Sequence, residues 1–282
     1  MDSMPRKHRT ARVTVIGNAE PVADLSSSID DADMVVRLNA CPHIHSGKIG
    51  AKTHVLCLRT FGSVGESFAR GESAISPGAL AGAEELWFVG EKGDWAPHII
   101  ERYKLGNRKH VFLTLRDMRE VDRLLGRYGG TERGASLGIM LLKFIADDPR
   151  HKNSEIAACC FGFEGWPGHP WQSEKRLFET YCCLGRVHAM DSRPYFDSIP
   201  NLAPHVEVVR GASGHEAVGP GSMRLKLSPP MAEVLDLVNG RRPVSALCDM
   251  LSQGSAQLSK TFEYEVCRAL WRLEDKGLVA CG

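Results

Sequence analysis

The sequence predicts an α/β fold: a doubly wound, mostly parallel sheet flanked by helices, followed by a small helical domain. Short unbroken apolar runs recur through the first three quarters of the chain, and helical patterns lie between them. Apolar runs of this length suit strands that are covered on both faces, as in a parallel sheet. At 282 residues the chain is also long enough for one large α/β domain and a second, small one.

The apolar runs give the predicted strands, which are VTVIG (13–17), MVVRL (34–38), HVLCL (54–58), ELWFVG (85–90), HVFLTL (110–115) and EIAACCFGF (155–163). The strongest helical pattern is ASLGIMLLKFIADD (135–148), where apolar residues recur at spacings of three and four. Alternation of strands and helices favours an open, doubly wound sheet. Ligands of such sheets bind beyond the carboxyl ends of the strands, so the residues after each run are the first candidates for a site.

The predicted organisation has four parts: a basic N-terminal arm (1–12), the α/β domain (13–210), a Gly/Ser-rich linker (211–221) and a small domain (222–282). A short strand and three helices are predicted in the small domain. Ser228, followed by two prolines, is a good helix start, and Gly240 and Gly277 are good helix ends.

Composition excludes several classes of protein. The net charge of +1, with both signs interspersed, argues against nucleic-acid binding. The nine cysteines show no metal-ligand spacing, and apolar surroundings favour buried, reduced thiols over disulfides. No stretch reaches the ~20 apolar residues of a membrane span, so we expect a cytoplasmic protein.

Two amides follow the first two predicted strands. VIGNAEP ends in the turn Gly17-Asn18, and VVRLNACPH places Asn39 at the equivalent position. The glycine patterns of NAD, FAD and P-loop sites are absent. Two amides on one sheet edge would suit a nucleotide whose base is read by side-chain hydrogen bonds. A turn-capping role for Asn18 remains the alternative.

The run from residue 15 to residue 55 resembles the large sialyl motif of animal-type sialyltransferases. The matching residues are Gly17-Asn18, Asp33, Arg37, Asn39, Pro42 and the segment Gly50-Ala51-Lys52-Thr53. ASLGIMLLKF followed by EIAACCFGF resembles the small motif of that family through Ser136 and Gly138. His169 and Glu174 fit its very small motif, H-x-x-x-x-E. Ala19, Ala135 and Leu137 depart from the family pattern, and its His/Tyr-rich motif has no counterpart.

The resemblance implies a Rossmann-like, sialyltransferase-like glycosyltransferase of the soluble, bacterial type. Such an enzyme would move sialic acid or a related keto-sugar acid from a CMP donor to an acceptor hydroxyl, with inversion and without metal or cofactor. His169 would be the general base, because a pKa near 6.5 suits that task at neutral pH. Glu174 would hold the imidazole or cap the neighbouring helix. Gly17, Asn18, Asn39, Ser136 and Gly138 would bind the donor, with anions favoured at the helix N-terminus.

Other interpretations of these residues remain open. His169 can be a turn residue, Glu174 a carboxylate in the first turn of a helix, and Ser136 a plain helix start. Arg37, inside an apolar strand, reads as a paired structural residue. The chain as a whole can be a catalytically inactive nucleotide-sugar binder that acts in peptide or protein recognition. A methyltransferase is poorly supported, because the first strand lacks the Gly-rich turn.

The small domain resembles the winged-helix-like domains of the pyrroloquinoline-quinone chaperone family. The likeness rests on LSPPMAEVLDLVNGRRPVSAL and on the terminal LEDKGLV. It implies recognition of a leader peptide, added as a strand to a sheet edge, so the acceptor could be a peptide as well as a glycan. A packing or dimerisation module is the alternative. DNA binding is disfavoured, because residues 222–282 carry eight Lys/Arg against seven Asp/Glu.

Overall fold

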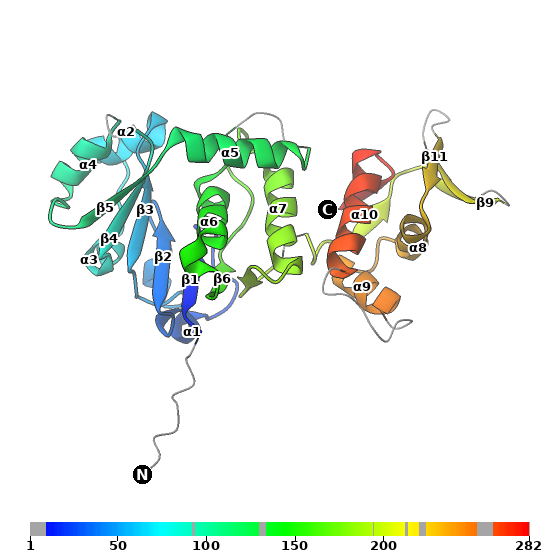
Figure 1. Cartoon of the computed structure of the whole chain (residues 1–282), viewed down its shortest axis with the longest axis horizontal. Coiled ribbons are helices and arrows are strands. Elements are labelled where there is room, and N and C mark those ends of the chain that lie inside the picture. Colours follow the sequence, from blue (N-terminus) through cyan, green and yellow to red (C-terminus); the bar gives the residue numbers. More distant parts are fainter. Residues whose placement is uncertain are drawn as a thin grey trace, which may run out of the picture. The chain divides into compact units, whose positions relative to one another are not determined.

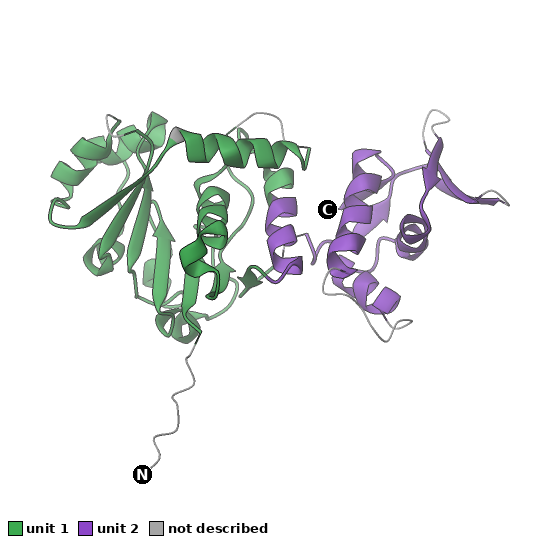
Figure 2. Ribbon diagram, in the orientation of Figure 1, with its two compact units in different colours: residues 1–174, 186–192 green, residues 175–185, 193–282 purple. Residues whose placement is uncertain are grey.

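The structure is a computed structural model, which describes residues 10–91, 94–129, 134–193, 195–211, 214–219, 224–252 and 262–281 (Figure 1). Most of the predicted basic arm, residues 1–9, lies outside the described residues. The chain forms two compact units (Figure 2). The first comprises residues 1–174 and 186–192, and the second comprises residues 175–185 and 193–282.

The first unit is built on one parallel sheet of seven strands in the order β5-β4-β3-β2-β1-β6-β7. This confirms the predicted fold class. The strands are β1 (Arg12–Ile16), β2 (Met34–Leu38), β3 (Val55–Arg59), β4 (Glu85–Val89), β5 (Lys109–Leu113), β6 (Glu155–Cys159) and β7 (His188–Ala189). The predicted sixth strand is shortened, because Cys160 adopts a left-handed backbone conformation (φ 60°) that ends β6.

The connecting helices cover both faces of the sheet (Figure 1). They are α1 (Ser26–Asp30), α2 (Gly62–Arg70), α3 (Pro77–Gly82), α4 (Ala96–Arg102), α5 (Leu115–Gly126) and α6 (Leu137–Asp147), with short 3₁₀ turns η1 (Ile44–Ser46) and η2 (Pro149–His151). Helix α7 (Trp171–Cys183) begins in the first unit and continues into the second. Strand β4 shows the double winding directly. Leu86 and Phe88 join a core with α2, α3 and α4, whereas Trp87 contacts Phe144 of α6 edge-on at 5.6 Å. Successive side chains of a strand point to opposite faces, so both faces are packed.

Arg37 has the structural role that its place in an apolar strand predicts. It is 1% exposed, and its guanidinium donates to the carbonyl oxygens of Ile49 (2.7 Å), Gly50 (3.0 Å) and Lys52 (3.0 Å). It also donates to the hydroxyl of Thr53 at 3.1 Å. Asp30 receives the backbone N–H groups of residues 51 and 52 in the same loop. The segment from Gly50 to Thr53 is therefore a braced turn that leads into β3.

The second unit contains helices α8 (Pro229–Leu237), α9 (Val244–Ser252) and α10 (Phe262–Asp275), as predicted, together with the C-terminal part of α7. Ser228 precedes α8, and Gly240 and Gly277 have the positive φ values expected beyond helix ends. Arg176 of α7 is buried and donates to Glu274 (2.6 Å) and Asp275 (2.8 Å) of α10.

The predicted linker differs from the structure. Residues 214–218 form strand β10 (Gly214–Val218), which pairs antiparallel with β9 (Glu207–Gly211) and with β11 (Arg224–Leu227). The Gly/Ser-rich composition of the segment hides a short strand that hydrogen bonds on both sides hold in place. A two-stranded pair, β8 (Pro200–Leu202) with β12 (Val279–Cys281), completes this unit. The compact units also divide at residue 174, and not at the predicted linker.

The nine cysteines are free thiols, and all but Cys182 and Cys281 are buried. This agrees with the prediction of buried thiols. In the described part of the chain, no helix combines the length and the apolar character that a membrane crossing needs.

We expect Arg37→Met to lower the free energy of unfolding by about 3–5 kcal/mol, because it leaves buried carbonyl oxygens without a donor. Arg70→Met is the matched control. Arg70 pairs with Glu66 on the exposed face of α2, and such pairs contribute about 1 kcal/mol or less. Urea unfolding measures both changes. Equal losses in the two variants would show that Arg37 does not brace the loop.

Candidate active site

The carboxyl ends of three neighbouring strands meet at one cavity. Ile16 of β1 lies level with Arg37 of β2 and with Cys159 of β6, so the residues that follow each strand lie at one edge of the sheet. Because the chain winds outward from β1 on one side and returns as β6 on the other, this edge is the topological switch point where doubly wound sheets bind ligands. The cavity has a volume of about 400 Å³, which suits a small organic ligand. It is lined by Gly17, Asn18, Ala19, Leu38, Asn39, Arg59, Val64, Ser136, Leu137, Gly138, Cys160, Phe161, Gly162, Phe163, Glu164, His169 and Trp171.

Gly17 forms part of the cavity floor and has no room for a side chain. A Cβ atom there would lie 2.1 Å from the carbonyl oxygen of Cys160. The backbones touch because Gly17 donates to the carbonyl of Cys159 (2.9 Å) and Ala19 donates to that of Cys160 (3.0 Å). The glycine in VIGNAEP therefore permits the chain after β1 to lie directly on the chain after β6.

The two predicted amides have different surroundings. The side chain of Asn18 is exposed at the cavity. Asn39 has a φ of 47°, a left-handed conformation that asparagine tolerates better than most residues. Its side-chain oxygen accepts the backbone N–H of Arg59 at 3.0 Å. The Asn39 carboxamide thus links β2 to β3, and its NH₂ group remains as a donor for a ligand.

Ser136 caps the N-terminus of α6 beside the cavity. Its hydroxyl accepts from the N–H of Ile139 at 3.4 Å. The N–H groups of Leu137 and Gly138 lack partners within the helix, as the first N–H groups of an α-helix do. Gly138 lies close to Phe161, with 3.1 Å between the place of a Cβ and the ring. This end of α6 offers N–H donors and the positive end of a helix dipole, both of which favour an anion.

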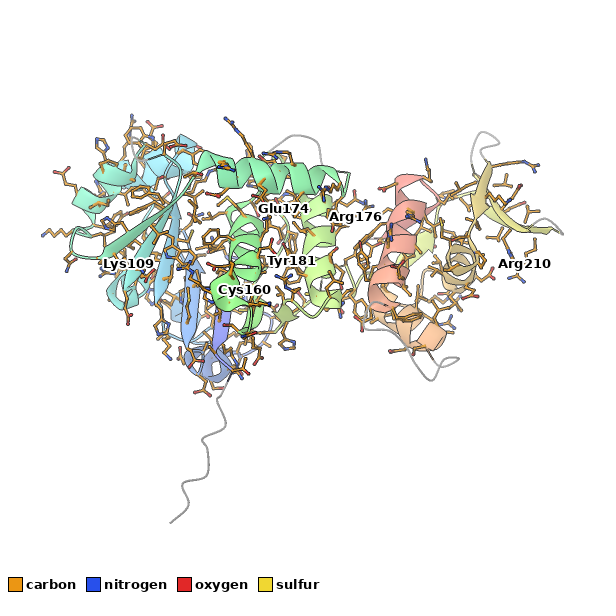
Figure 3. The ribbon with its side chains drawn as sticks, in the orientation of Figure 1. Lys109, Cys160, Glu174, Arg176, Tyr181 and Arg210 are labelled. Atoms are coloured by element: carbon orange, nitrogen blue, oxygen red, sulfur yellow. The ribbon has the colours of Figure 1, made fainter. Side chains whose placement is uncertain are left out.

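Glu174 lies in the first turn of α7 (Figure 3) and is fully buried. It is not among the residues that line the cavity. Its carboxylate accepts the N–H of Ser136 at 2.7 Å and the hydroxyl of Ser136 at 2.5 Å. Burial raises the pKa of Glu174 to about 7, although the bonds from Ser136 lower it. Of the two roles that the sequence leaves open for Glu174, this geometry favours capping the neighbouring helix over holding the imidazole.

His169 stands at the cavity between two tryptophans. The centroid of its ring lies 4.9 Å from that of Trp166 and 4.8 Å from that of Trp171, both edge-on. Its Nδ1 lies 2.7 Å from the carbonyl oxygen of Gly134. A carbonyl can only accept, so Nδ1 carries the proton and Nε2 holds the lone pair of the neutral ring.

The protonation state of His169 also suits a base. Burial lowers the pKa of His169 below its ordinary value of 6.5; the hydrogen bond to Gly134 raises it and the positive charge of Arg59 lowers it. The ring is therefore neutral at pH 7, with Nε2 as the available base.

Arg59 and Trp171 line the cavity and are not among the predicted site residues. Arg59 ends β3, the position that Ile16 and Leu38 hold in their strands, so the rule that pointed to Gly17 and Asn39 could have found it. Trp171 begins α7, two residues after His169, and nothing in its surroundings marks it as a site residue. Asp191, which follows β7, holds the N–H of Cys160 at 2.7 Å and so supports the cavity floor.

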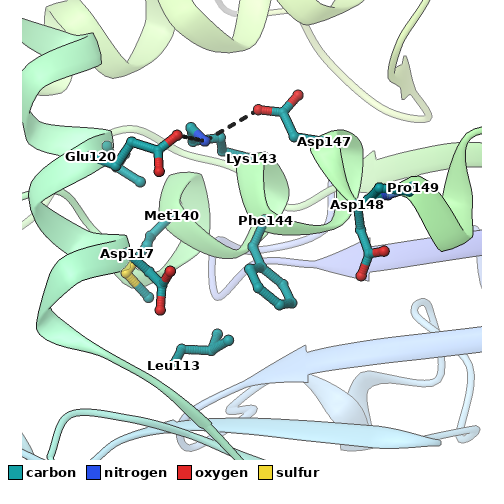
Figure 4. Close-up of a pocket in the computed structure, with 10 residues that line it drawn as sticks. Leu113, Asp117, Glu120, Met140, Lys143, Phe144, Asp147, Asp148 and Pro149 are labelled. Atoms are coloured by element: carbon teal, nitrogen blue, oxygen red, sulfur yellow. Dashed lines mark hydrogen bonds and ion pairs between the residues drawn. The ribbon is translucent and has the colours of Figure 1, made fainter.

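A second cavity, of about 360 Å³, lies between α5 and α6 (Figure 4). Leu113, Met140 and Phe144 give it apolar walls. Lys143 at its rim binds Glu120 at 2.9 Å and Asp147 at 3.2 Å. The cation among the residues that line this cavity is therefore already neutralised, and the hollow lies away from the switch point.

Among the described residues, one group has the composition of a metal site. Ligand atoms of Glu179, Cys183 and Cys267, all buried in the second unit, lie within 4.8 Å of one another. Arg193 donates to the carboxylate of Glu179 and, at 3.3 Å, to the sulfur of Cys183. The guanidinium already supplies positive charge beside these ligand atoms, so we assign no metal to them.

No model of a known protein family matches the chain. The urease operon 23 kDa accessory protein of Rhizobium meliloti (strain 1021) is 23% identical over 200 residues, which cover 63% of this chain and 92% of that protein. A mammalian sialyltransferase in complex with Gal-beta-1-3GalNAc-ortho-nitrophenol is similar with a TM-score of 0.46 and 17% identity, over 65% of this chain and 70% of that one.

The PqqD truncation of Methylobacterium extorquens PqqCD, described as a stand-alone recognition element for ribosomally synthesised, modified peptides, is similar with a TM-score of 0.27 and 23% identity. The match covers 32% of this chain and 99% of that one. At these identities and TM-scores, none of the likenesses assigns an activity to this chain.

We expect Glu174→Gln to remove a pH dependence of stability. The pKa of Glu174 is about 7 in the folded chain, against about 4.5 when it is unperturbed. The folded state therefore holds this proton more tightly, and its contribution to stability is full below pH 4.5 and is lost as the pH rises through 7. Denaturant unfolding from pH 4 to pH 8 should show this decline in the native chain and a shallower one in the variant.

Glu120→Gln is the control, because Glu120 is exposed and its bond to Lys143 lowers its pKa. Its removal should leave the decline between pH 4.5 and 7 in place. The same slope in the native chain and in Glu174→Gln would rule out a raised pKa at Glu174.

Proposed function

We propose that the first unit is an inverting glycosyltransferase that moves sialic acid or a related keto-sugar acid from a CMP donor to an acceptor hydroxyl. One observation carries the proposal. Every residue predicted to contact the donor or to act as base, Glu174 apart, lines the single cavity at the switch point of the sheet: Gly17, Asn18, Asn39, Ser136, Gly138 and His169.

In the proposed reaction His169 acts at its Nε2 atom. The acceptor hydroxyl attacks the anomeric carbon while its proton passes to Nε2, and the bond from that carbon to the phosphate oxygen breaks with its electrons going to CMP. The bond from Nδ1 to Gly134 fixes the tautomer and the orientation of the ring. General base catalysis of this kind contributes ~10²–10⁴ in rate.

The donor would lie across the strand ends. In the proposal Asn18 and the NH₂ group of Asn39 bind the nucleotide, and the N-terminus of α6 binds an anionic group of the donor. Glu174 then acts as a positioning residue through Ser136, because it fixes the start of α6. The proposed steps involve no metal ion.

A second candidate function is a non-catalytic accessory role. It is favoured by the Rhizobium relative, whose name is that of an accessory protein, and by Ala19 and Leu137, which replace polar residues of the sialyl motifs. Turnover separates the candidates, because a binder would have none to lose.

For the second unit we propose recognition of a leader peptide or a partner protein at the edge strand β9. This strand pairs with β10 on one side, and its side chains are mostly exposed. An extended peptide can add to such an edge through main-chain hydrogen bonds.

Calorimetric binding of CMP, compared with UDP, GDP and S-adenosylmethionine in the presence of EDTA, tests the donor assignment. We expect selective binding of CMP. Equal, weak binding of all four compounds would contradict the assignment of a CMP donor, and selective binding of S-adenosylmethionine would indicate a methyltransferase.

We expect His169→Ala to lower turnover by ~10²–10⁴, the share that a general base contributes, and to leave CMP binding unchanged. In the native enzyme, activity should fall on the acid side only below pH 6.5, because burial lowers the pKa of His169. His151, which does not line the cavity, provides the control His151→Ala. Native turnover in His169→Ala would exclude this residue as the base.

A further inference from the structure

Arg59 is a cation without a counter-ion in the cavity. Among the described residues that line the cavity at the switch point, Arg59 is the one with a Lys or Arg side chain. Among the described residues no carboxylate forms an ion pair with it, although Glu164 lines the same cavity. Its Nε atom is buried and has no hydrogen-bond partner within the part of the chain that the structure describes. Buried polar atoms of proteins nearly always have partners, so this exception calls for an explanation.

The protein holds Arg59 in place. Its backbone N–H is bound by the side chain of Asn39 at 3.0 Å, at the end of β3. Its guanidinium lies over the ring of Phe61, 4.2 Å from the centroid, in a cation–π contact. Burial lowers the pKa of Arg59 from its usual high value, and a guanidinium remains charged at neutral pH. The charge is thus fixed before any ligand arrives.

Trp171 adds a second unused donor to the same cavity. Its indole Nε1 atom is buried and has no hydrogen-bond partner among the described residues. Arginine and tryptophan side chains donate and cannot accept. Both residues line the same cavity. Two donors without partners among the described residues match a ligand that brings acceptor oxygens, and the charge of Arg59 favours oxygens that are anionic.

We propose that Arg59 and Trp171 form an oxyanion-binding subsite that holds an anionic group of the sugar donor. This inference rests on the proposed function, and it assigns a binding role to two cavity residues, Arg59 and Trp171, that have none in the proposed reaction. A CMP-linked keto-sugar acid carries two anionic groups, a phosphate and a carboxylate. The cavity offers two cationic features for them, the N-terminus of α6 and the side chain of Arg59.

The subsite also fits the chemistry of His169. The positive charge of Arg59 contributes to the lowered pKa of the imidazole, and so favours the neutral ring that a base needs. Arg59 would therefore bind the donor and keep the base unprotonated until the acceptor hydroxyl gives up its proton.

The test measures binding of cytidine, CMP, UMP, GMP, CMP-sialic acid and free sialic acid to the full chain and to three variants. Arg59→Met keeps the length of the stem without the charge, Arg59→Lys keeps the charge, and Trp171→Phe keeps a ring without the N–H. We expect Arg59→Met to weaken an anionic ligand by about 10- to 100-fold, the usual effect of losing a charge-assisted hydrogen bond. Trp171→Phe should weaken it by a few fold and Arg59→Lys should recover part of the loss.

The ligands identify the oxyanion. A loss that already affects CMP assigns Arg59 to the phosphate. A loss confined to CMP-sialic acid and free sialic acid assigns it to the carboxylate. Cytidine, which is neutral, should bind all variants like the native chain, a result that a merely disrupted cavity would not give. In nuclear magnetic resonance titrations Arg59→Met should also raise the pKa of His169, because a nearby positive charge is removed.

The measured affinities distinguish an incorrect subsite from an incorrect proposed function. Selective CMP binding with unchanged affinities of every anion in Arg59→Met overturns the subsite and leaves the function standing. Binding of UMP and GMP as tight as that of CMP, with all three weakened in Arg59→Met, upholds the subsite and overturns the CMP donor. A native chain that binds none of these anions overturns both.

Discussion

The buried carboxylate of Glu174 holds the candidate site together. It accepts both the N–H and the hydroxyl of Ser136, and so joins the first turn of α7 to the start of α6. The carbonyl of Gly134, just before α6, accepts from Nδ1 of His169, so Nε2 of the neutral ring carries the lone pair. Glu174 thus fixes the start of α6, two residues after the carbonyl that sets the tautomer of His169. The protein accepts the cost of a buried acid with a pKa of about 7 to obtain this geometry.

The location of the cavity follows from the winding of the sheet. Strands β2 to β5 lie to one side of β1, and β6 and β7 lie to the other. Connections of one handedness then send helices to opposite faces and leave a crevice above β1. The polar groups that line the crevice come from five separate parts of the chain. Hydrogen bonds between side chains and backbone hold these segments in place; examples are the bond from the N–H of Arg59 to the carboxamide of Asn39 and the bond from the N–H of Cys160 to Asp191.

Sequence patterns were sufficient for six of the seven strands of the parallel sheet and for six of the residues that line the cavity, because unbroken apolar runs and the residues just after them are local features. Long-range contacts decided the rest. The left-handed turn at Cys160 shortens β6, and no residue type announces it, since cysteine seldom adopts that conformation. The composition of residues 214–218 predicts a linker, but hydrogen bonds to β9 and β11 make this segment strand β10. The sequence leaves two roles open for Glu174, because its partner Ser136 lies 38 positions earlier in the chain and local spacing does not reveal that contact.

The contact between Gly17 and Cys160 has a consequence for how the protein is made. Two hydrogen bonds join the residues after β1 to the end of β6, although most of the first unit lies between these segments in the sequence. Contacts of high sequence separation form slowly, because closing the chain between them costs entropy first. A nascent chain that extends only to α6 has every strand from β1 to β5 and still lacks the cavity floor. The cavity can therefore form only after β6 has left the ribosome and paired with β1.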